Sequence, residues 1–137
     1  MPKYEGLLAE TVTYTGDVGD VINAYMARPL GSGPYPGVIV VHHMPGWDDA
    51  TKEITRRFAH SGYIAVMPNL HYRGAPDAAP DDAAAITRAA GGVPDDQFIG
   101  DAEGSARFLS RLPYHSGKTG MIGFCSGGRQ TYLAAGR

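Results

Sequence analysis

The residue best placed to do chemistry in this sequence is its single cysteine, Cys125. A short apolar run, Met121-Ile122, ends in Gly123, and Gly127 follows the cysteine by two positions. A strand, a sharp turn and a helix-compatible segment in this order form a nucleophile elbow, G-x-Nuc-x-G, with cysteine where serine is more common. The elbow needs glycine on both sides because the turn is strained and a side chain there would collide with the adjacent strand and helix.

The neighbouring Ser126 does not fit the same pattern. Its flanking glycines would have to be at positions 124 and 128, and position 124 is Phe. The structural alternative for Cys125 is a small buried hydrophobic residue, which is the commonest role of a lone free cysteine. The apolar run before it and the helix-compatible segment after it favour the nucleophile.

The histidines are the next residues with catalytic or metal-binding chemistry. All five precede the cysteine, at His42, His43, His60, His71 and His115. No spacing such as H-E-x-x-H or C-x-x-C is present, so no metal site is expected. His42, His43 and His71 lie in segments that could approach one another, and we interpret them as pocket-lining or loop residues. No cofactor is expected.

The first elements of the chain predict an antiparallel hairpin. Residues 10–14 and 21–27 are rich in β-formers, and Gly16 to Asp20 between them has the composition of a turn. A loop is expected over residues 31–37.

Strands and helices alternate after this hairpin. Continuous apolar runs at 37–42 and 63–67 lack the two-residue alternation of a half-exposed strand and predict strands buried on both faces. Helices are expected from Asp48 or Asp49 to about Ser61, with Ile54 and Phe58 on its apolar side, and over residues 81–90. Asp95 is the expected cap of a third helix running to about 112, whose apolar stripe is Phe98, Ala102, Ala106 and Leu109. A turn at 113–117, the strand before the elbow and a last helix complete the chain.

This order predicts an α/β fold with a mostly parallel sheet between helical layers. Ligands of such sheets bind beyond the carboxyl ends of the strands. Three segments leave those ends: residues 42–47, residues 69–76 and residues 125–127.

Composition narrows the function classes. The chain has 137 residues, a net charge of −2 and no long run of either sign, which argues against nucleic-acid or membrane-surface binding. One cysteine allows no intrachain disulfide, and the first residues lack the apolar core of a signal peptide. We therefore expect a single domain over residues 1–137 in the cytoplasm.

Taken together, these segments resemble the dienelactone hydrolase family of the α/β-hydrolase fold over nearly the whole chain. The cysteine elbow is the most specific part of the resemblance. The other matching segments are residues 37–42, Arg57-Phe58-Ala59, Gly62-Tyr63-Ile64-Ala65, Pro68-Asn69-Leu70, Tyr72-Arg73 and Gly117-Lys118.

The resemblance implies a hydrolase that cleaves an ester or lactone through Cys125. The backbone N–H groups of Ser126 and Met44 would hold the oxyanion, since the next residue, Pro45, has no N–H. Arg73 matches a family position that binds the substrate carboxylate, a task that suits its planar fork, and so hints at an anionic acid or lactone. Without the family, Arg73 would be taken as a solvated loop charge. Tyr72, Trp47 and Phe124 could provide an apolar wall.

One departure from the family concerns His43, which stands where the family often has glutamate. A cationic imidazole there would favour the Cys125 thiolate at neutral pH. The alternative is that His43 lines the pocket and hydrogen-bonds to loop backbone.

A second departure is that no Asp, Glu or His follows Cys125 among its last twelve residues. Because this fold orders its triad as nucleophile, acid and histidine, we expect an incomplete domain, truncated after the elbow helix and inactive alone. It would be a truncated gene product, a fragment of a larger protein, or half of an assembly completed by another chain or copy. Its uncovered sheet edge would be apolar.

Two other functions stay open. One is a non-catalytic role, in which the chain is a fragment or pseudoenzyme that binds a partner through the uncovered sheet edge. A flavodoxin-like nucleotide binder would use residues 123–128 as a phosphate loop, although no G-x-G-x-x-G or G-K-[ST] pattern is present.

Overall fold

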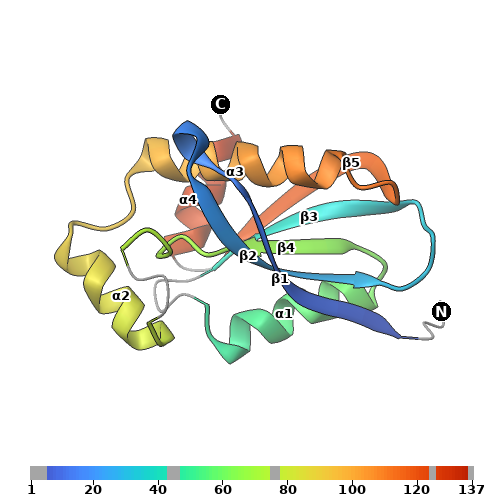
Figure 1. The fold of residues 1–137 in the computed structure, drawn as a ribbon, viewed down its shortest axis with the longest axis horizontal. Coiled ribbons are helices and arrows are strands. Elements are labelled where there is room, and N and C mark those ends of the chain that lie inside the picture. Colours follow the sequence, from blue (N-terminus) through green and yellow to red (C-terminus); the bar gives the residue numbers. More distant parts are fainter. Residues whose placement is uncertain (1–5, 43–46, 75–77, 124–125, 136–137) are drawn as a thin grey trace.

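The fold is centred on a mixed five-stranded sheet in the order β1-β2-β4-β3-β5 (Figure 1). It comes from a computed structural model, in which residues 6–42, 47–74, 78–123 and 126–135 are described. The strands are β1 Leu7–Thr15, β2 Val21–Pro29, β3 Tyr35–Val41, β4 Ile64–Pro68 and β5 His115–Gly123.

The predicted N-terminal hairpin is confirmed. β1 and β2 pair antiparallel around a short 3-10 turn, Asp17–Gly19. β2 then pairs antiparallel with β4, and β3 pairs parallel with both β4 and β5. Because β2 runs opposite to β4, the hairpin turn lies at the same edge of the sheet as the carboxyl ends of β3, β4 and β5.

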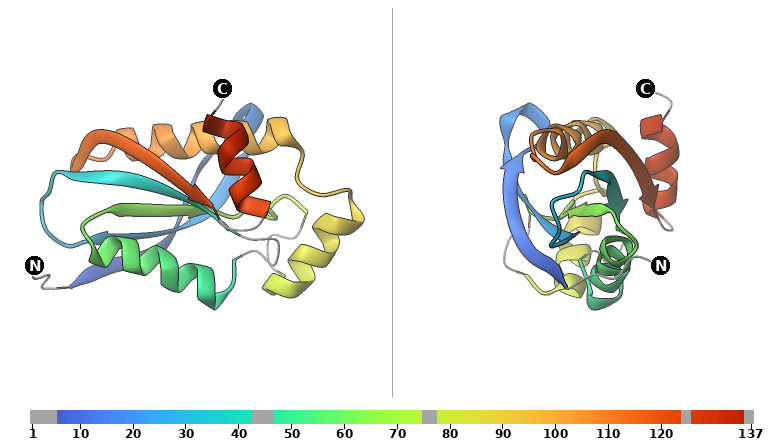
Figure 2. Two further views of the ribbon diagram at one scale, coloured as in Figure 1. Left: turned by 180° about the vertical axis from the view of Figure 1, so that it is seen from behind. Right: turned by 90° about the vertical axis from the view of Figure 1, so that its right-hand side faces the viewer.

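Helices cover both faces of this sheet, which confirms the three-layer α/β arrangement (Figure 2). The helix α1 (Asp49–His60) packs on one face, against β2 and β4. The helices α3 (Asp95–Ser110) and α4 (Ser126–Ala135) pack on the other face, and α2 (Pro80–Ala89) lies beyond the carboxyl ends of the strands (Figures 1 and 2). The buried core residues on the two faces include Val38, Val40 and Met67 on one side and Ile39, Phe98 and Leu109 on the other.

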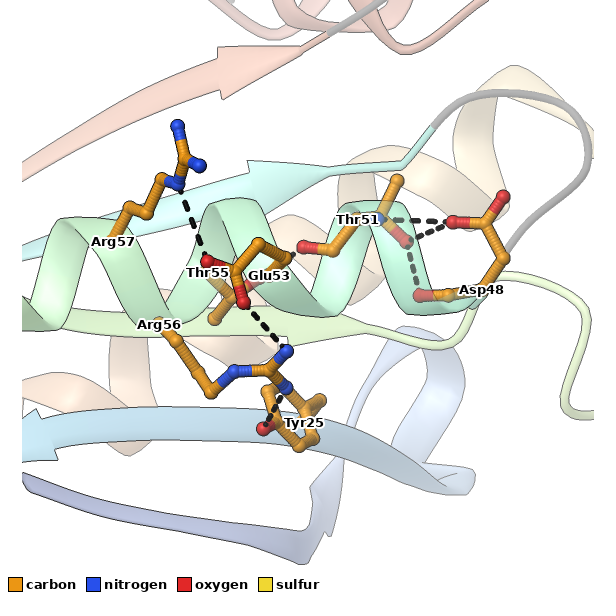
Figure 3. Close-up of polar contacts among 7 residues, drawn as sticks. All are labelled: Tyr25, Asp48, Thr51, Glu53, Thr55, Arg56 and Arg57. Carbon is orange, nitrogen blue, oxygen red and sulfur yellow. Dashed lines mark hydrogen bonds and ion pairs between the residues drawn. The ribbon is translucent and has the colours of Figure 1, made fainter.

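The start of α1 follows from its cap. The Asp48 side chain accepts a hydrogen bond from the Thr51 backbone N–H at 2.9 Å, which satisfies one of the free donors of the first turn (Figure 3). Gly62, with a φ of 100°, follows the helix in a left-handed conformation that glycine adopts without strain.

The buried face of α1 differs from the expected one. Ile54 and Phe58 are only half-buried, whereas Thr51, Thr55 and Ala59 are fully buried. A buried threonine is tolerated because its hydroxyl finds an acceptor within the helix: Thr55 Oγ1 donates to the Thr51 carbonyl oxygen at 2.9 Å. The apolar pattern alone therefore placed the buried stripe one residue away from its position.

Several predicted boundaries were wrong by a few residues. β3 begins at Tyr35, within the segment expected to be a loop, and β5 begins at His115, within the expected turn, because the two strands pair from Tyr35 and His115 onward. β4 runs from Ile64 to Pro68 instead of over 63–67, and α3 ends at Ser110 instead of at about 112.

β5 is the last strand of the described sheet, and in the described part of the chain it pairs with β3 alone. Residues 116–120 are exposed along it. A mainly apolar groove of about 340 Å³ lies between β5, α3 and α4, and is lined among others by Ile99, Met121 and Ala134. No helix in the described ranges has the length and apolar character needed to cross a membrane.

Candidate functional site

The carboxyl ends of β3, β4 and β5 meet where the sequence predicts the site. β5 ends at Gly123 and α4 begins at Ser126, so residue 125 falls between a strand and a helix, as the elbow requires. Cys125 itself and Phe124 lie outside the described residues, as do Met44 and His43. The strand and helix around the elbow are confirmed, and the roles of these four residues stay predictions.

Two buried histidines tie the strand ends together. His42 follows β3, His71 follows β4, and their ring centroids are 5.0 Å apart. The Leu70 backbone N–H donates to His42 Nε2 at 3.1 Å. Because Nε2 accepts this bond, the geometry assigns the proton of a neutral His42 to Nδ1. The structure thus brings together two of the three histidines expected to approach one another.

Trp47 was expected to form part of an apolar wall beside the substrate. Its described contacts are on the face of the sheet that α1 covers. Its indole N–H donates to the Met67 carbonyl oxygen at 3.1 Å, and its ring meets Tyr25 edge to face with centroids 6.3 Å apart. The Lys52 ammonium lies 4.7 Å from the ring centroid. These contacts anchor the segment that follows residues 43–46, and a contact with substrate stays a prediction.

Tyr72 and Arg73 lie in the turn after β4. The Tyr72 side chain is half-buried, and its backbone N–H donates to the Asn69 carbonyl oxygen at 3.2 Å. Their expected roles in substrate binding remain untested.

Arg73 forms ion pairs with two carboxylates at this edge of the sheet. Its two terminal nitrogens donate to the two Asp101 carboxylate oxygens, each at 2.8 Å, and its Nε donates to Asp20 at 2.8 Å. The hydrogen bonds from Arg73 to Asp101 and then to Asp20 raise the already high pKa of the guanidinium, so it stays charged.

Asp101 is a buried residue that the sequence prediction missed. It lies on α3, is fully buried, and also accepts the Asp17 backbone N–H at 2.8 Å. The available signal was its spacing: Asp101 follows Phe98 by three residues and precedes Ala102, so an acidic residue stands on the apolar stripe of the helix.

Close packing holds the β1–β2 turn against α3. A Cβ at Gly104 would overlap the Thr15 carbonyl oxygen, and one at Gly16 would overlap the Asp101 carboxylate. The Tyr14 hydroxyl and Ser105 Oγ are 2.6 Å apart, and burial raises the pKa of Tyr14. The hairpin turn, α3 and the turn after β4 are therefore packed and hydrogen-bonded together around Arg73.

No group of three or more His, Cys, Asp or Glu side chains among the described residues has an arrangement that could hold a metal ion.

The model of the dienelactone hydrolase family matches residues 22–137. The chain belongs to the dienelactone hydrolase family. A protein of Salmonella typhimurium named as a carboxymethylenebutenolidase is 35% identical over 133 residues, which are 96% of this chain and 49% of that protein.

Solved structures agree with dienelactone hydrolase family membership. A structure named as a dienelactone hydrolase from Klebsiella pneumoniae superposes with a TM-score of 0.79 and 30% identity, over 96% of this chain and 55% of that one. The dienelactone hydrolase-like promiscuous phosphotriesterase P91, from metagenomic libraries, has a TM-score of 0.78 and 30% identity over 94% of this chain and 54% of its own. The chain spans about half the length of these relatives. The expected α/β-hydrolase fold is thus confirmed.

Proposed function

We propose that this chain carries the nucleophile of a dienelactone hydrolase-type enzyme that cleaves an ester or lactone. The observation that carries the proposal is the position of residue 125 between the end of β5 and the start of α4, in a chain of this family. A cysteine at that turn would be exposed at the carboxyl edge of the sheet, where substrates of such folds bind.

The proposed reaction has two steps. The Cys125 thiolate attacks the carbonyl carbon, and the oxyanion rests on the N–H groups of Ser126 and Met44. Collapse of this intermediate breaks the ester C–O bond and leaves an acyl group on sulfur. Water then hydrolyses the thioester and restores the thiol.

The second step needs a general base, and we propose that it comes from outside these 137 residues. No Asp, Glu or His follows Cys125 in the chain, which spans about half the length of its relatives. The chain alone should therefore be acylated by an activated ester and turn over little.

The test is to react the chain with p-nitrophenyl acetate and follow p-nitrophenol release and protein mass. We expect an acetyl adduct on Cys125, its absence in Cys125→Ala, and retention in the matched variant Thr131→Ala on α4. Sustained turnover that persists in Cys125→Ala would contradict the proposal.

The two alternative roles of His43 can be distinguished by titrating the Cys125 thiol. If a cationic His43 favours the thiolate, His43→Gln raises the pH at which Cys125 reacts with an alkylating agent. If His43 only lines the pocket, the reactivity profile keeps its midpoint.

A second candidate is a non-catalytic binding or assembly role. The observation that favours it is the exposed stretch of residues 116–120 on β5, the last strand of the described sheet. Unpaired strand edges recruit further strands. Light scattering would show an oligomer under this proposal, and a monomer that binds no apolar dye would contradict it.

A further inference from the structure

We propose that the side chain of His42 is a pH-sensitive latch for the turn after β4. In its neutral form the imidazole accepts the Leu70 backbone N–H and holds residues 69–73 to the end of β3, and protonation of the ring releases them. The inference concerns the fold at this edge of the sheet and does not rest on the proposed function.

The described backbone ladder between β3 and β4 ends before the turn. The two strands pair in parallel over residues 37–39 and 64–66. Beyond these pairs, the connection is made by a side chain, because His42 Nε2 lies 3.1 Å from the Leu70 backbone nitrogen. The imidazole therefore joins the strand end to the turn where the described ladder no longer does.

The turn is bonded to other elements at its two ends. The Asn69 backbone N–H donates to the Asn23 carbonyl oxygen on β2 at 3.0 Å, and Arg73 donates to Asp101 on α3. Among the hydrogen bonds of the described residues, the one from Leu70 joins this turn to the end of β3. Its loss would free the middle of the turn while both ends stay attached.

The accepting atom makes this bond sensitive to pH. Nε2 needs its lone pair to accept the Leu70 N–H, so the neutral ring carries its proton on Nδ1. A second proton can bind only to Nε2, where it would face the Leu70 N–H, and two donors cannot bond to each other. Protonated His42 therefore loses the bond and leaves the Leu70 N–H without this acceptor.

The surroundings oppose protonation further. His42 and His71 are only 2% and 3% exposed, and their ring centroids are 5.0 Å apart, so burial and repulsion both disfavour a positive charge on His42. Other titratable or charged side chains at this corner are Tyr72 in the same turn and the Asp101 carboxylate of α3, which is bonded to Arg73. The buried apolar residues there are Val41, Leu70, Phe98 and Ala102.

The direction of the pH dependence follows from these contacts. A histidine exposed to water takes up a proton near about pH 6.5, whereas the closed latch excludes that proton. The latch is therefore fully closed above about pH 6.5 and is lost as pH falls below it. The equilibrium constant for opening should rise by up to about tenfold per pH unit.

Amide hydrogen exchange of the whole chain, followed by NMR from about pH 7.5 to about pH 5.5, tests the inference. The reference amide is that of Val66, a fully buried residue of β4 that lies in the ladders with β2 and β3. After correction for intrinsic exchange rates, we expect the protection of Leu70 relative to Val66 to fall about tenfold between about pH 6.5 and 5.5. A ratio that stays constant over this range would overturn the inference.

Three substitutions identify the titrating group. In His42→Gln the side-chain amide oxygen can accept the Leu70 N–H and does not titrate, so the ratio should become independent of pH. His71→Gln leaves the acceptor in place and should keep the fall. The matched control is His60→Gln, which removes an exposed histidine from α1 and should also keep it. Persistence of the fall in His42→Gln, or its loss in His71→Gln, would assign the titration to another group and refute the latch.

A second measurement needs no variant. The ¹⁵N signals of the His42 ring at about pH 7.5 report which nitrogen carries the proton, and we expect it on Nδ1. A proton on Nε2 at this pH would overturn the inference, even if the variants failed to fold. Neither measurement needs Cys125 to react, so the latch and the proposed function are tested separately.

Discussion

Two arginine–carboxylate networks in this structure have contacts of similar length and very different surroundings. Arg73 meets the fully buried Asp101 on a different element, 28 positions away in sequence. Arg56 and Arg57 meet Glu53 on the same helix, three and four positions away, at 2.8 and 3.3 Å (Figure 3). The side chains of the second network are 37% to 78% exposed.

The difference teaches that contact distance alone does not predict the energetic weight of an ion pair. An exposed pair within a helix is solvated whether it forms or not, and its loss costs little. A buried pair between distant segments must be complete, because removing one partner leaves a charge with neither water nor a counter-ion. Four substitutions, taken from the largest expected effect to the smallest, would sharpen or break this comparison.

The largest effect is expected for Asp101→Ala. It removes two of the three described side-chain hydrogen bonds of Arg73, which keeps its bond to Asp20, and takes the acceptor from the Asp17 N–H. We expect it to lower the free energy of unfolding by about 2–4 kcal/mol. Urea denaturation followed by circular dichroism measures the change. Asp101→Asn, whose amide oxygen still accepts hydrogen bonds, should lower the free energy of unfolding by less. A loss below about 1 kcal/mol for the alanine variant would show that the buried pair behaves like a surface pair.

The close contact between α3 and the hairpin gives the next effect. In Gly104→Ala the new methyl group meets the Thr15 carbonyl oxygen and the Gly16 Cα, so the two segments must separate. We expect a loss of about 1–3 kcal/mol in the same urea experiment, despite the better helix propensity of alanine. Gly120→Ala on β5 is the control, since a Cβ there meets open space. Equal stability of both variants would contradict the packing described.

A smaller effect is expected for Tyr14→Phe, which removes the 2.6 Å contact with Ser105. The loss at neutral pH should be about 1 kcal/mol, since Ser105 keeps its bond to the Asp101 carbonyl oxygen.

The same substitution has a pH signature. Because burial raises the pKa of Tyr14 in the fold, the unfolded chain releases this proton first as pH rises above about 10. Tyr14 then lowers the stability of the unchanged protein by about 1.4 kcal/mol per pH unit relative to Tyr14→Phe, until the folded pKa is reached. If the free energies of unfolding of the two proteins changed in parallel above about pH 10, the hydroxyl of Tyr14 would not be buried as described.

The smallest effect is expected for Glu53→Gln on α1. Hydrogen bonds from Arg56 and then from Arg57 lower the pKa of Glu53, so its contribution is present above the ordinary carboxyl pKa and is lost as pH falls through the lowered value. Because the group is exposed, we expect a Tm close to that of the unchanged protein, and a difference that shrinks further in high salt. A Tm loss comparable to that of Asp101→Ala would overturn the comparison.

The order of elements was predictable because each one is encoded by neighbouring residues. The β-forming residues and turn at 10–27, the continuous apolar strands and the glycines around Cys125 are local patterns, and the structure confirms the elements that they predict. The spacing around Cys125 likewise indicated a candidate nucleophile before any fold was known.

Tertiary structure decided which distant segments meet. Strand order places β4 between β2 and β3, which brings the hairpin turn to the carboxyl edge of the parallel strands. The fork of Arg73 could have faced solvent, a substrate or an acid, and only the packing of α3 against that turn directs it to Asp101. Local propensity is a property of a few adjacent residues, whereas the partner of a charge depends on which surfaces the whole chain brings together and removes from water.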